Sequence, residues 1–426
     1  MIWQIKTLDE LGFVARGKSK HRPRGDKKLY GGLYPLIQTG DIQKTDFYIS
    51  EFTNTYNDVG LAQSKLWKKG TLCLSIVGAN TAESAILGFD ACFPDSVIGF
   101  IANPEMSNEI FIKYYFDTMK LQMRKISDGG ARENLSMEKL FTFKIPTPPV
   151  IIQNKIASIL SSYDELIENN KQRIKLLEKI TEEIYKEWFV RLRFPGYENA
   201  KIVDGLPEGW ERKPIDTFVN IISGYAFKTE AFDSEGIYKL VTIKNVQDGF
   251  FVTQTTDYIY ELPKNLKEDC KLKDKDIILS LTGNIGRICM VYGDNYVLNQ
   301  RVAKLKPKQE SYFEFVYLMF RSSFLRATLE NLSNGAAQQN LSPIEMGKLE
   351  FPFPSEDVIN KFSELIKSFF DEIITLNKKN QLLQETRDLL LPRLISGKLN
   401  VEHLIDNEEN LLMVAEPSET YQKTKQ

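Results

Sequence analysis

The segment Gly12–Ser19 matches a pattern by which nucleotide-binding proteins hold phosphate groups. It reads Gly-Phe-Val-Ala-Arg-Gly-Lys-Ser, which fits G-x4-G-K-S. A working loop of this kind follows a buried strand and opens a helix, whose N-terminal amides face the phosphates. Here Pro23 and Gly25 follow closely and oppose a helix. A nucleotide-dependent enzyme using Gly17, Lys18 and Ser19 is therefore kept only as an alternative.

The same region is better explained as a basic loop that binds DNA phosphates than as a nucleotide site. Seven cations lie within the thirteen residues 16–28, and Asp26 is the only acid among them. A run of charge is usually just a solvated surface, but this density favours phosphate contact. The predicted phosphate-binding residues are Arg16, Lys18, Lys20, Arg22, Arg24, Lys27 and Lys28.

Side chains suited to catalysis or metal binding are sparse. His21 and His403 are the only histidines, which disfavours histidine acid–base chemistry and triads. The only Pro-Pro pair lies in Thr147-Pro-Pro-Val150, not in the Asn/Asp-Pro-Pro-Tyr/Phe motif of DNA amino-methyltransferases. The four cysteines are scattered, so no metal site is expected. We therefore expect a chain that is not catalytic by itself.

Polar residues suited to reading base edges occur at matching places in two halves of the chain. Base readout in the major groove uses Arg, Lys, Asn and Gln held on a rigid scaffold. Each candidate taken singly is more often part of a turn or a surface. The candidates are Gln38, Thr39, Asp41, Asn80 and Arg132 in the first half, and Thr242, Lys244, Asn245, Asn284, Arg287, Asn299, Gln300, Arg301, Gln338 and Gln339 in the second.

These candidates coincide because the chain repeats itself after about 206 residues. Residues 127–136 read SDGGARENLS, and residues 333–342 read SNGAAQQNLS, with six of ten positions identical. The Asn-Leu-Ser parts, Asn134–Ser136 and Asn340–Ser342, recur unchanged and are expected to be structural. The period is far longer than that of a solenoid, so each copy has the size of a domain. Diverged copies of one domain suggest two related but different targets.

Each copy ends at prolines and is followed by a long apolar seam with steps of four and three residues. Such a seam predicts long helices that pack lengthwise, here most simply as an antiparallel pair with a domain near each end. Asn170 and Asn380 lie in the seam and serve either register or partner contact. Eight of ten positions are apolar in both seams: Ile156, Leu160, Tyr163, Ile167, Asn170, Ile174, Leu177, Thr181, Ile184 and Trp188, and Phe362, Ile366, Phe369, Ile373, Leu376, Asn380, Leu383, Arg387, Leu390 and Leu394.

The predicted fold class is mixed α/β, with two homologous domains, two coiled-coil helices and an internal pseudo-twofold repeat. The expected boundaries are 1–149 and 210–354 for the domains, 150–193 and 355–400 for the helices, 194–209 for a linker and 401–426 for an acidic disordered tail. The net charge of the whole chain is −2, and neither domain by itself is strongly basic. No apolar run is long enough to span a membrane, and a reduced cytoplasmic protein is expected.

This arrangement resembles the specificity subunit of type I restriction-modification systems, over residues 1 to about 400. The resemblance is carried by Tyr34-Pro-Leu-Ile-Gln-Thr-Gly-Asp41, by Asn134-Leu-Ser with the exit Ile145-Pro-Thr-Pro, and by the helix from Gln153 to Asp164. The second copy keeps Asn340-Leu-Ser, the proline exit and Asp371. It departs from the first in being slightly acidic and in lacking a counterpart of the basic loop.

The resemblance implies two target-recognition domains that each read one half of a split site in double-stranded DNA. The helices would space these domains and seat two methyltransferase subunits, which bind S-adenosylmethionine and methylate adenine. Separate restriction subunits would bring ATP- and magnesium-dependent translocation and cleavage, so this chain itself needs no cofactor. A coiled-coil scaffold that never touches DNA is the remaining alternative.

Overall fold

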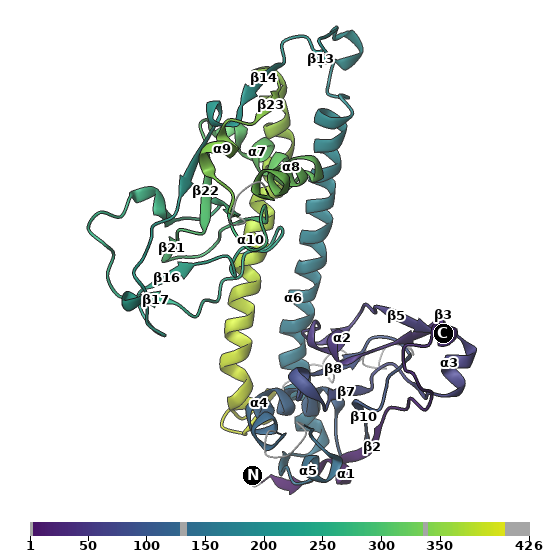
Figure 1. The fold of residues 1–426 in the computed structure, drawn as a ribbon. Coiled ribbons are helices and arrows are strands. Elements are labelled where there is room, and N and C mark those ends of the chain that lie inside the picture. The colour runs from purple at the N-terminus through teal and green to yellow at the C-terminus, as the bar shows by residue number, and fades with distance from the viewer. Residues whose placement is uncertain (1–2, 128–133, 335–339, 405–426) are drawn as a thin grey trace, which may run out of the picture. The chain divides into compact units, whose positions relative to one another are not determined.

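The computed structural model describes residues 3–127, 134–334 and 340–404 of the chain (Figure 1). The chain divides into two compact units. The first unit is Met1–Ile167 together with Leu383–Gln426, and the second is Glu168–Leu382. Each unit thus holds one copy of the repeat and a stretch of both long helices.

The first unit is built on two small sheets and a strand pair. Its first sheet has the order β2-β10-β7-β8-β4, and its second β5-β3-β9-β6. The first sheet comprises β2 (Gly12–Arg16), β10 (Val97–Ala102), β7 (Leu72–Ser75), β8 (Ser84–Leu87) and β4 (Tyr48–Ile49). The second comprises β5 (Asn54–Tyr56), β3 (Tyr30–Leu36), β9 (Ala91–Cys92) and β6 (Leu66–Trp67), and β1 (Gln4–Lys6) pairs with β11 (Ile145–Thr147).

Short helices connect the strands of this unit, and one longer helix covers its first sheet. Strands β7 and β8 are buried along their whole length, as expected where both faces of a strand are covered. Helix α4 packs on β7, β8 and β10, and its buried residues include Phe111, Tyr114 and Phe116. The helices are α1 (Leu8–Leu11), α2 (Thr39–Gln43), α3 (Asp58–Ala62), α4 (Glu109–Ser127), α5 (Met137–Leu140) and α6 (Val150–Tyr185).

The second unit repeats these sheets with the same strand neighbours, except that its first sheet has four strands among the described residues where that of the first unit has five. Its sheets have the orders β15-β22-β19-β20 and β17-β16-β21-β18. The first comprises β15 (Val219–Ser223), β22 (Val302–Pro307), β19 (Ile277–Ser280) and β20 (Ile288–Met290). The second comprises β17 (Tyr258–Ile259), β16 (Tyr238–Val241), β21 (Tyr296–Leu298) and β18 (Lys271–Leu272), and β14 (Glu211–Pro214) pairs with β23 (Glu350–Phe353). The β16–β21 pair is parallel, like β3–β9 in the first unit.

The helices of the second unit differ from those of the first, most clearly at the position of α4. Where the first unit has the single helix α4, the second has two helices that meet at Ser322. The helices are α7 (Phe313–Arg321), α8 (Ser323–Asn334), α9 (Pro343–Gly347) and α10 (Glu356–Ile395). The expected pair of homologous mixed α/β domains is confirmed by the matching sheets.

In the first unit, the beginning of α6 runs antiparallel to the end of α10. Ile152, Ile156 and Leu160 of α6 share one core with Leu390 and Leu394 of α10. The start of α6 is held by Gln153, which is fully buried and donates to the backbone carbonyls of Pro148 and Met106. Helix α6 begins at Val150, directly after Pro148 and Pro149, since proline suits the start of a helix.

In the second unit, the remaining parts of the same two helices are also antiparallel. Asn170 Nδ2 donates to Asn380 Oδ1 at 2.8 Å, and Trp188 packs on Phe362 with ring centroids 5.5 Å apart. The two asparagines thus satisfy each other inside the seam, as a register-setting pair does. Every seam position named above is buried or half-buried in its own unit.

Two segments expected to be loose are packed in the structure. Residues 194–209 contain the hairpin β12 (Ile202–Val203) and β13 (Leu206–Pro207), and buried Phe194 lies against Trp210. Packing also continues past residue 400, because Val401 is only 3% exposed and belongs to the core of the first unit. Residues 405–426, the rest of the expected tail, lie outside the described residues.

Candidate nucleic-acid interface

The P-loop interpretation of Gly12–Ser19 is wrong on geometric grounds. Residues 12–16 form strand β2, and the next helical element is only the short 3-10 turn Lys27–Leu29. The amides of Gly17 and Lys18 donate to the carbonyls of Val97 and Phe93, so neither is free for a phosphate. Gly17 is required by packing, since a Cβ there would lie 2.2 Å from the Phe93 carbonyl oxygen.

The basic loop, residues 16–28, presents all seven of its cations on the surface. It is held in place by Gln63, whose Oε1 accepts from the amides of Lys20 and His21. Three of the cations are paired: Arg22 and Arg24 contact Asp95, and Lys28 contacts Asp26. Among the described residues, no carboxylate pairs with the other four, Arg16, Lys18, Lys20 and Lys27. These four form the part of the loop with free positive charge.

Asn245 is corrected from a base reader to a turn-forming residue. Asp41 makes the same kind of turn contact, and its role as a base reader stays a prediction. Asp41 accepts from the amide of Gln38 at 2.8 Å, and Asn245 accepts from the amide of Thr242 at 2.9 Å, in the equivalent turn. Asn245 is only 2% exposed and also donates to the carbonyls of Val252 and Gln254. Because its side chain is buried and saturated, it cannot reach a base.

The other candidates differ in how far they can reach. Gln38, Lys244, Asn284, Gln300 and Arg301 are exposed, and Thr39, Asn80, Thr242, Arg287 and Asn299 are partly exposed. The structure brings Thr39 and Asn80 together, with Asn80 Nδ2 3.5 Å from Thr39 Oγ1. It also places Asn284 and Arg287 in one hollow. Arg132, Gln338 and Gln339 lie outside the described residues. Base contact by these residues stays a prediction.

A family model described as the type I restriction modification DNA specificity domain matches this chain twice, over residues 2–179 and 207–384. Together the two matches cover well over half of the chain. The chain belongs to this family. Each match comprises one repeated domain and most of the helix that follows it, so the specificity domain is the repeating unit found in the sequence.

Individual relatives agree with this assignment. The chain is similar to the Type I restriction enzyme MjaIX specificity subunit of Methanocaldococcus jannaschii, with 27% identity over 427 residues and 94% of each chain covered. It is 24% identical to the HindI specificity subunit of Haemophilus influenzae, covering 91% of this chain and 98% of that one. The crystal structure of the S subunit from M. genitalium shares the fold, with a TM-score of 0.60 at 17% identity over 92% and 96% of the chains.

In both specificity domains, the repeated Asn-Leu-Ser segment has the structural role expected from its recurrence. Leu135 and Leu341 are fully buried and donate their amides to the carbonyls of Ile76 and Leu281. The serines that follow cap the next short helices, Ser136 for α5 and Ser342 for α9. The segment thus ties the domain exit to the first sheet.

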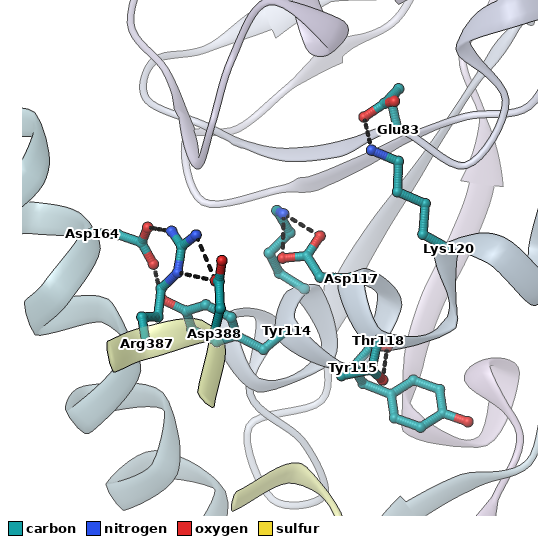
Figure 2. Close-up of polar contacts among 10 residues, drawn as sticks. Glu83, Tyr114, Tyr115, Asp117, Thr118, Lys120, Asp164, Arg387 and Asp388 are labelled. Atoms are coloured by element: carbon teal, nitrogen blue, oxygen red, sulfur yellow. Dashed lines mark hydrogen bonds and ion pairs between the residues drawn. The ribbon is translucent and has the colours of Figure 1, made fainter. Parts of the chain in front are cut away.

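The sequence reasoning missed buried charge clusters that bind each specificity domain to its helices. In the first unit, Arg387 of α10 pairs with Asp164 of α6, and Tyr114 of α4 donates to the same carboxylate (Figure 2). Burial raises the pKa of Asp164, and the guanidinium of Arg387 opposes that shift. The available signal was Arg387 itself, the charged residue in a mostly apolar seam.

The second unit has a corresponding cluster made from different residues. Arg321 of α7 pairs with Glu178 at 3.2 Å and with Glu182 at 2.9 Å, both on α6. It also contacts the hydroxyl of Tyr317 at 3.0 Å. Burial raises the pKa of Glu178, and the guanidinium of Arg321 opposes that shift. Each unit thus ties its recognition domain to α6 through a polar cluster that contains a half-buried arginine.

The four cysteines are buried thiols, and burial raises the pKa of Cys73 and Cys289, which disfavours thiolate chemistry. Within the described residues, no group of three or more His, Cys, Asp or Glu side chains could hold a metal ion. In that same part of the chain, no helix is long and apolar enough to cross a membrane.

Proposed function

We propose that this chain is the DNA sequence-recognition subunit of a type I restriction-modification complex, and that each unit reads one half of a bipartite, asymmetric site. The observation that carries the proposal is the pair of specificity domains whose shared strands have the same order but which carry different polar residues at equivalent surface positions. One scaffold presenting two side-chain sets suits two different half-sites. The family match argues against a scaffold that never touches DNA.

Partner subunits supply the chemistry in this proposal. Two methyltransferase subunits would bind S-adenosylmethionine, and restriction subunits would use ATP and magnesium. The long helices offer them apolar surface in the second unit, where Leu176 and Ile180 of α6 and Leu365 and Leu382 of α10 are exposed. Leu176 and Ile180 lie one turn apart on α6, and this exposed apolar pair supports docking of a further protein.

The purified chain alone is expected neither to methylate nor to cut DNA, with or without S-adenosylmethionine, ATP and magnesium. Together with its modification subunits, it is expected to direct adenine methylation to a two-part motif. Long-read methylation mapping in a host with and without the gene tests both halves of the motif at once. Turnover by the partner-free chain, or a methylome that does not depend on the gene, would contradict the proposal.

The four unpaired cations of the basic loop are expected to contact DNA phosphates. Replacing Arg16, Lys18, Lys20 and Lys27 by Ala should reduce the slope of log affinity against log salt, by about 0.9 for each lost contact. The affinity should fall alike for cognate and random duplexes, because phosphates carry no sequence information. Fluorescence anisotropy of the assembled complex between low and moderate salt measures both quantities.

A matched control uses the paired cations of the same loop. Replacing Arg22 and Arg24, which contact Asp95, should change the slope less for each charge removed. Equal salt slopes for wild type and the fourfold variant would mean that the loop is only a solvated surface.

A further inference from the structure

A hollow of about 570 Å³ opens in the second unit, between the turn that links β19 to β20 and helix α8. The turn contains Gly283 and Gly286, whose φ angles of 71° and 77° suit glycine and expose the residues between them. Polar groups dominate the lining. The lining residues are Gln247, Asp248, Gly283, Asn284, Ile285, Arg287, Arg326, Glu330 and Ser333.

Arg287 is held in this hollow with part of its hydrogen-bonding edge unused. Its Nη1 donates to Gln247 Oε1, and with the Asn284 amide turned so that its oxygen faces the arginine, both Nη1 and Nη2 lie 3.2 Å from that oxygen. A guanidinium has five N–H donors. Nε and the remaining hydrogen of Nη2 have no acceptor among the described residues. Together they form a side-on pair of parallel donors, the arrangement that matches O6 and N7 of guanine.

The charge around Arg287 favours a base edge over a phosphate. Arg326 is paired with Asp248 at 2.7 Å, and Glu330 lines the same hollow. Two arginines are thus balanced by two carboxylates, so the hollow has little net attraction for an anion. A G·C pair presents acceptors on guanine and an amino donor on cytosine, and so it suits a surface that carries both arginine and carboxylate groups.

The position in the first unit that is equivalent to Arg287 carries an acidic residue, Glu83, in place of a basic one. The amide of Ser280 donates to the carbonyl of Arg287, and the amide of Ser75 donates in the same way to Glu83. Glu83 contacts Lys120 and Arg124 of α4, each at 2.7 Å (Figure 2 shows the lysine). The Glu83 carboxylate is thus neutralised by ion pairs with two cationic side chains of the same unit. The same turn thus carries an open donor in one unit and a neutralised acceptor in the other.

We propose that Arg287 reads a guanine in the half-site recognised by the second unit, with Gln247 and Asn284 as its positioning residues. This inference rests on the proposed function, because it names a specificity-determining contact for the same DNA readout. It predicts an invariant G·C pair in that half-site, read from the major groove.

The test is methylation mapping with the full chain and its modification subunits, in wild type and in Arg287→Ala and Arg287→Gln. Both variants should still methylate, but the preference for guanine at one position of the second half-site should fall by about 5- to 150-fold. Arg287→Gln should gain most for adenine, since glutamine suits N6 and N7 of adenine. Gln247→Ala should relax the same position to a smaller extent. The first half-site and the gap should not change.

Arg212→Ala serves as the matched control, because Arg212 is an exposed arginine of β14 outside the lining of the hollow. It should leave the motif unchanged. A second half-site without an invariant G·C pair, an unchanged motif in both Arg287 variants, or equally reduced methylation at every sequence overturns the inference. In each of these outcomes, methylation still occurs at a bipartite motif and still requires the chain, so the proposed function stands. If methylation in the wild-type host did not require the chain, the proposed function would be contradicted instead. Thermal unfolding of each purified variant identifies any that fail to fold. If the Arg287 variants fail to fold, the methylation motif of Gln247→Ala decides the test.

Discussion

Replacing Arg387 by Ala is expected to lower the free energy of unfolding of the first unit by about 3–5 kcal/mol. Asp164 is only 6% exposed and takes its charge partner from α10 (Figure 2). Removing the guanidinium leaves a buried carboxylate without a counter-ion, with only the Tyr114 hydroxyl still donating to it. Denaturant titration, with hydrogen exchange of peptides from α4 and α6, measures the loss and assigns it to this unit.

The paired variant Asp164→Asn with Arg387→Met separates charge from packing. It removes both charges and keeps similar side-chain volumes, so most of the lost stability should return. The control Asp388→Asn should have little effect, because Asp388 is exposed although it also contacts Arg387. If Arg387→Ala and the double variant were equally unstable, the arginine would act through its packed side chain and not through its charge.

The stability lost in Arg387→Ala should depend on pH. Burial raises the pKa of Asp164 in the folded state, so folding favours the protonated carboxyl and its ionised form relies on Arg387. The difference between wild type and variant should be largest at a pH above the pKa of Asp164, where the carboxylate is ionised. It should shrink as the pH falls through the raised pKa of Asp164, because a neutral carboxyl needs no cation.

Lengthening both long helices by seven residues is expected to widen the gap between the two half-sites. The insertions belong between Ile167 and Glu168 in α6 and between Leu382 and Leu383 in α10, where the two units divide. Seven residues keep the helical phase within about 20° and add roughly 10 Å. At ~3.4 Å per base pair, the gap should grow by about three base pairs at most.

The bases read in each half should stay the same, since no recognition residue moves within its own unit. Groove phase can reduce the shift or lower the affinity, because paired recognition units act best about one helical turn apart. A seven-residue insertion in the hairpin segment 194–209, which leaves both helices intact, is the control and should leave the gap unchanged. Methylome sequencing reports gap and bases together. An active variant that keeps the old gap would show that the helices do not set the spacing.

Much of the fold was predictable because its signals are local or periodic. The repeated Asn-Leu-Ser segments indicated structural positions, and in both the leucine is buried and the serine caps the next helix. The seam residues predicted two long helices from a spacing that depends only on helix geometry. The turn residues Asp41 and Asn245 show the limit of this reasoning. Their matching positions indicated a shared role, but the sequence did not reveal that their side chains close a turn.

By itself, the sequence determined the duplicated architecture, the long helices and the family, because repetition and periodicity survive in one dimension. Only the tertiary structure decided which polar groups remain available. Arg24 is paired with Asp95, Arg387 with Asp164 and Arg287 with Gln247, partners that are 71, 223 and 40 residues apart. Pairing over such distances is set by how sheets and helices pack, and a buried or paired side chain has lost the hydrogen-bonding capacity that its residue type suggests.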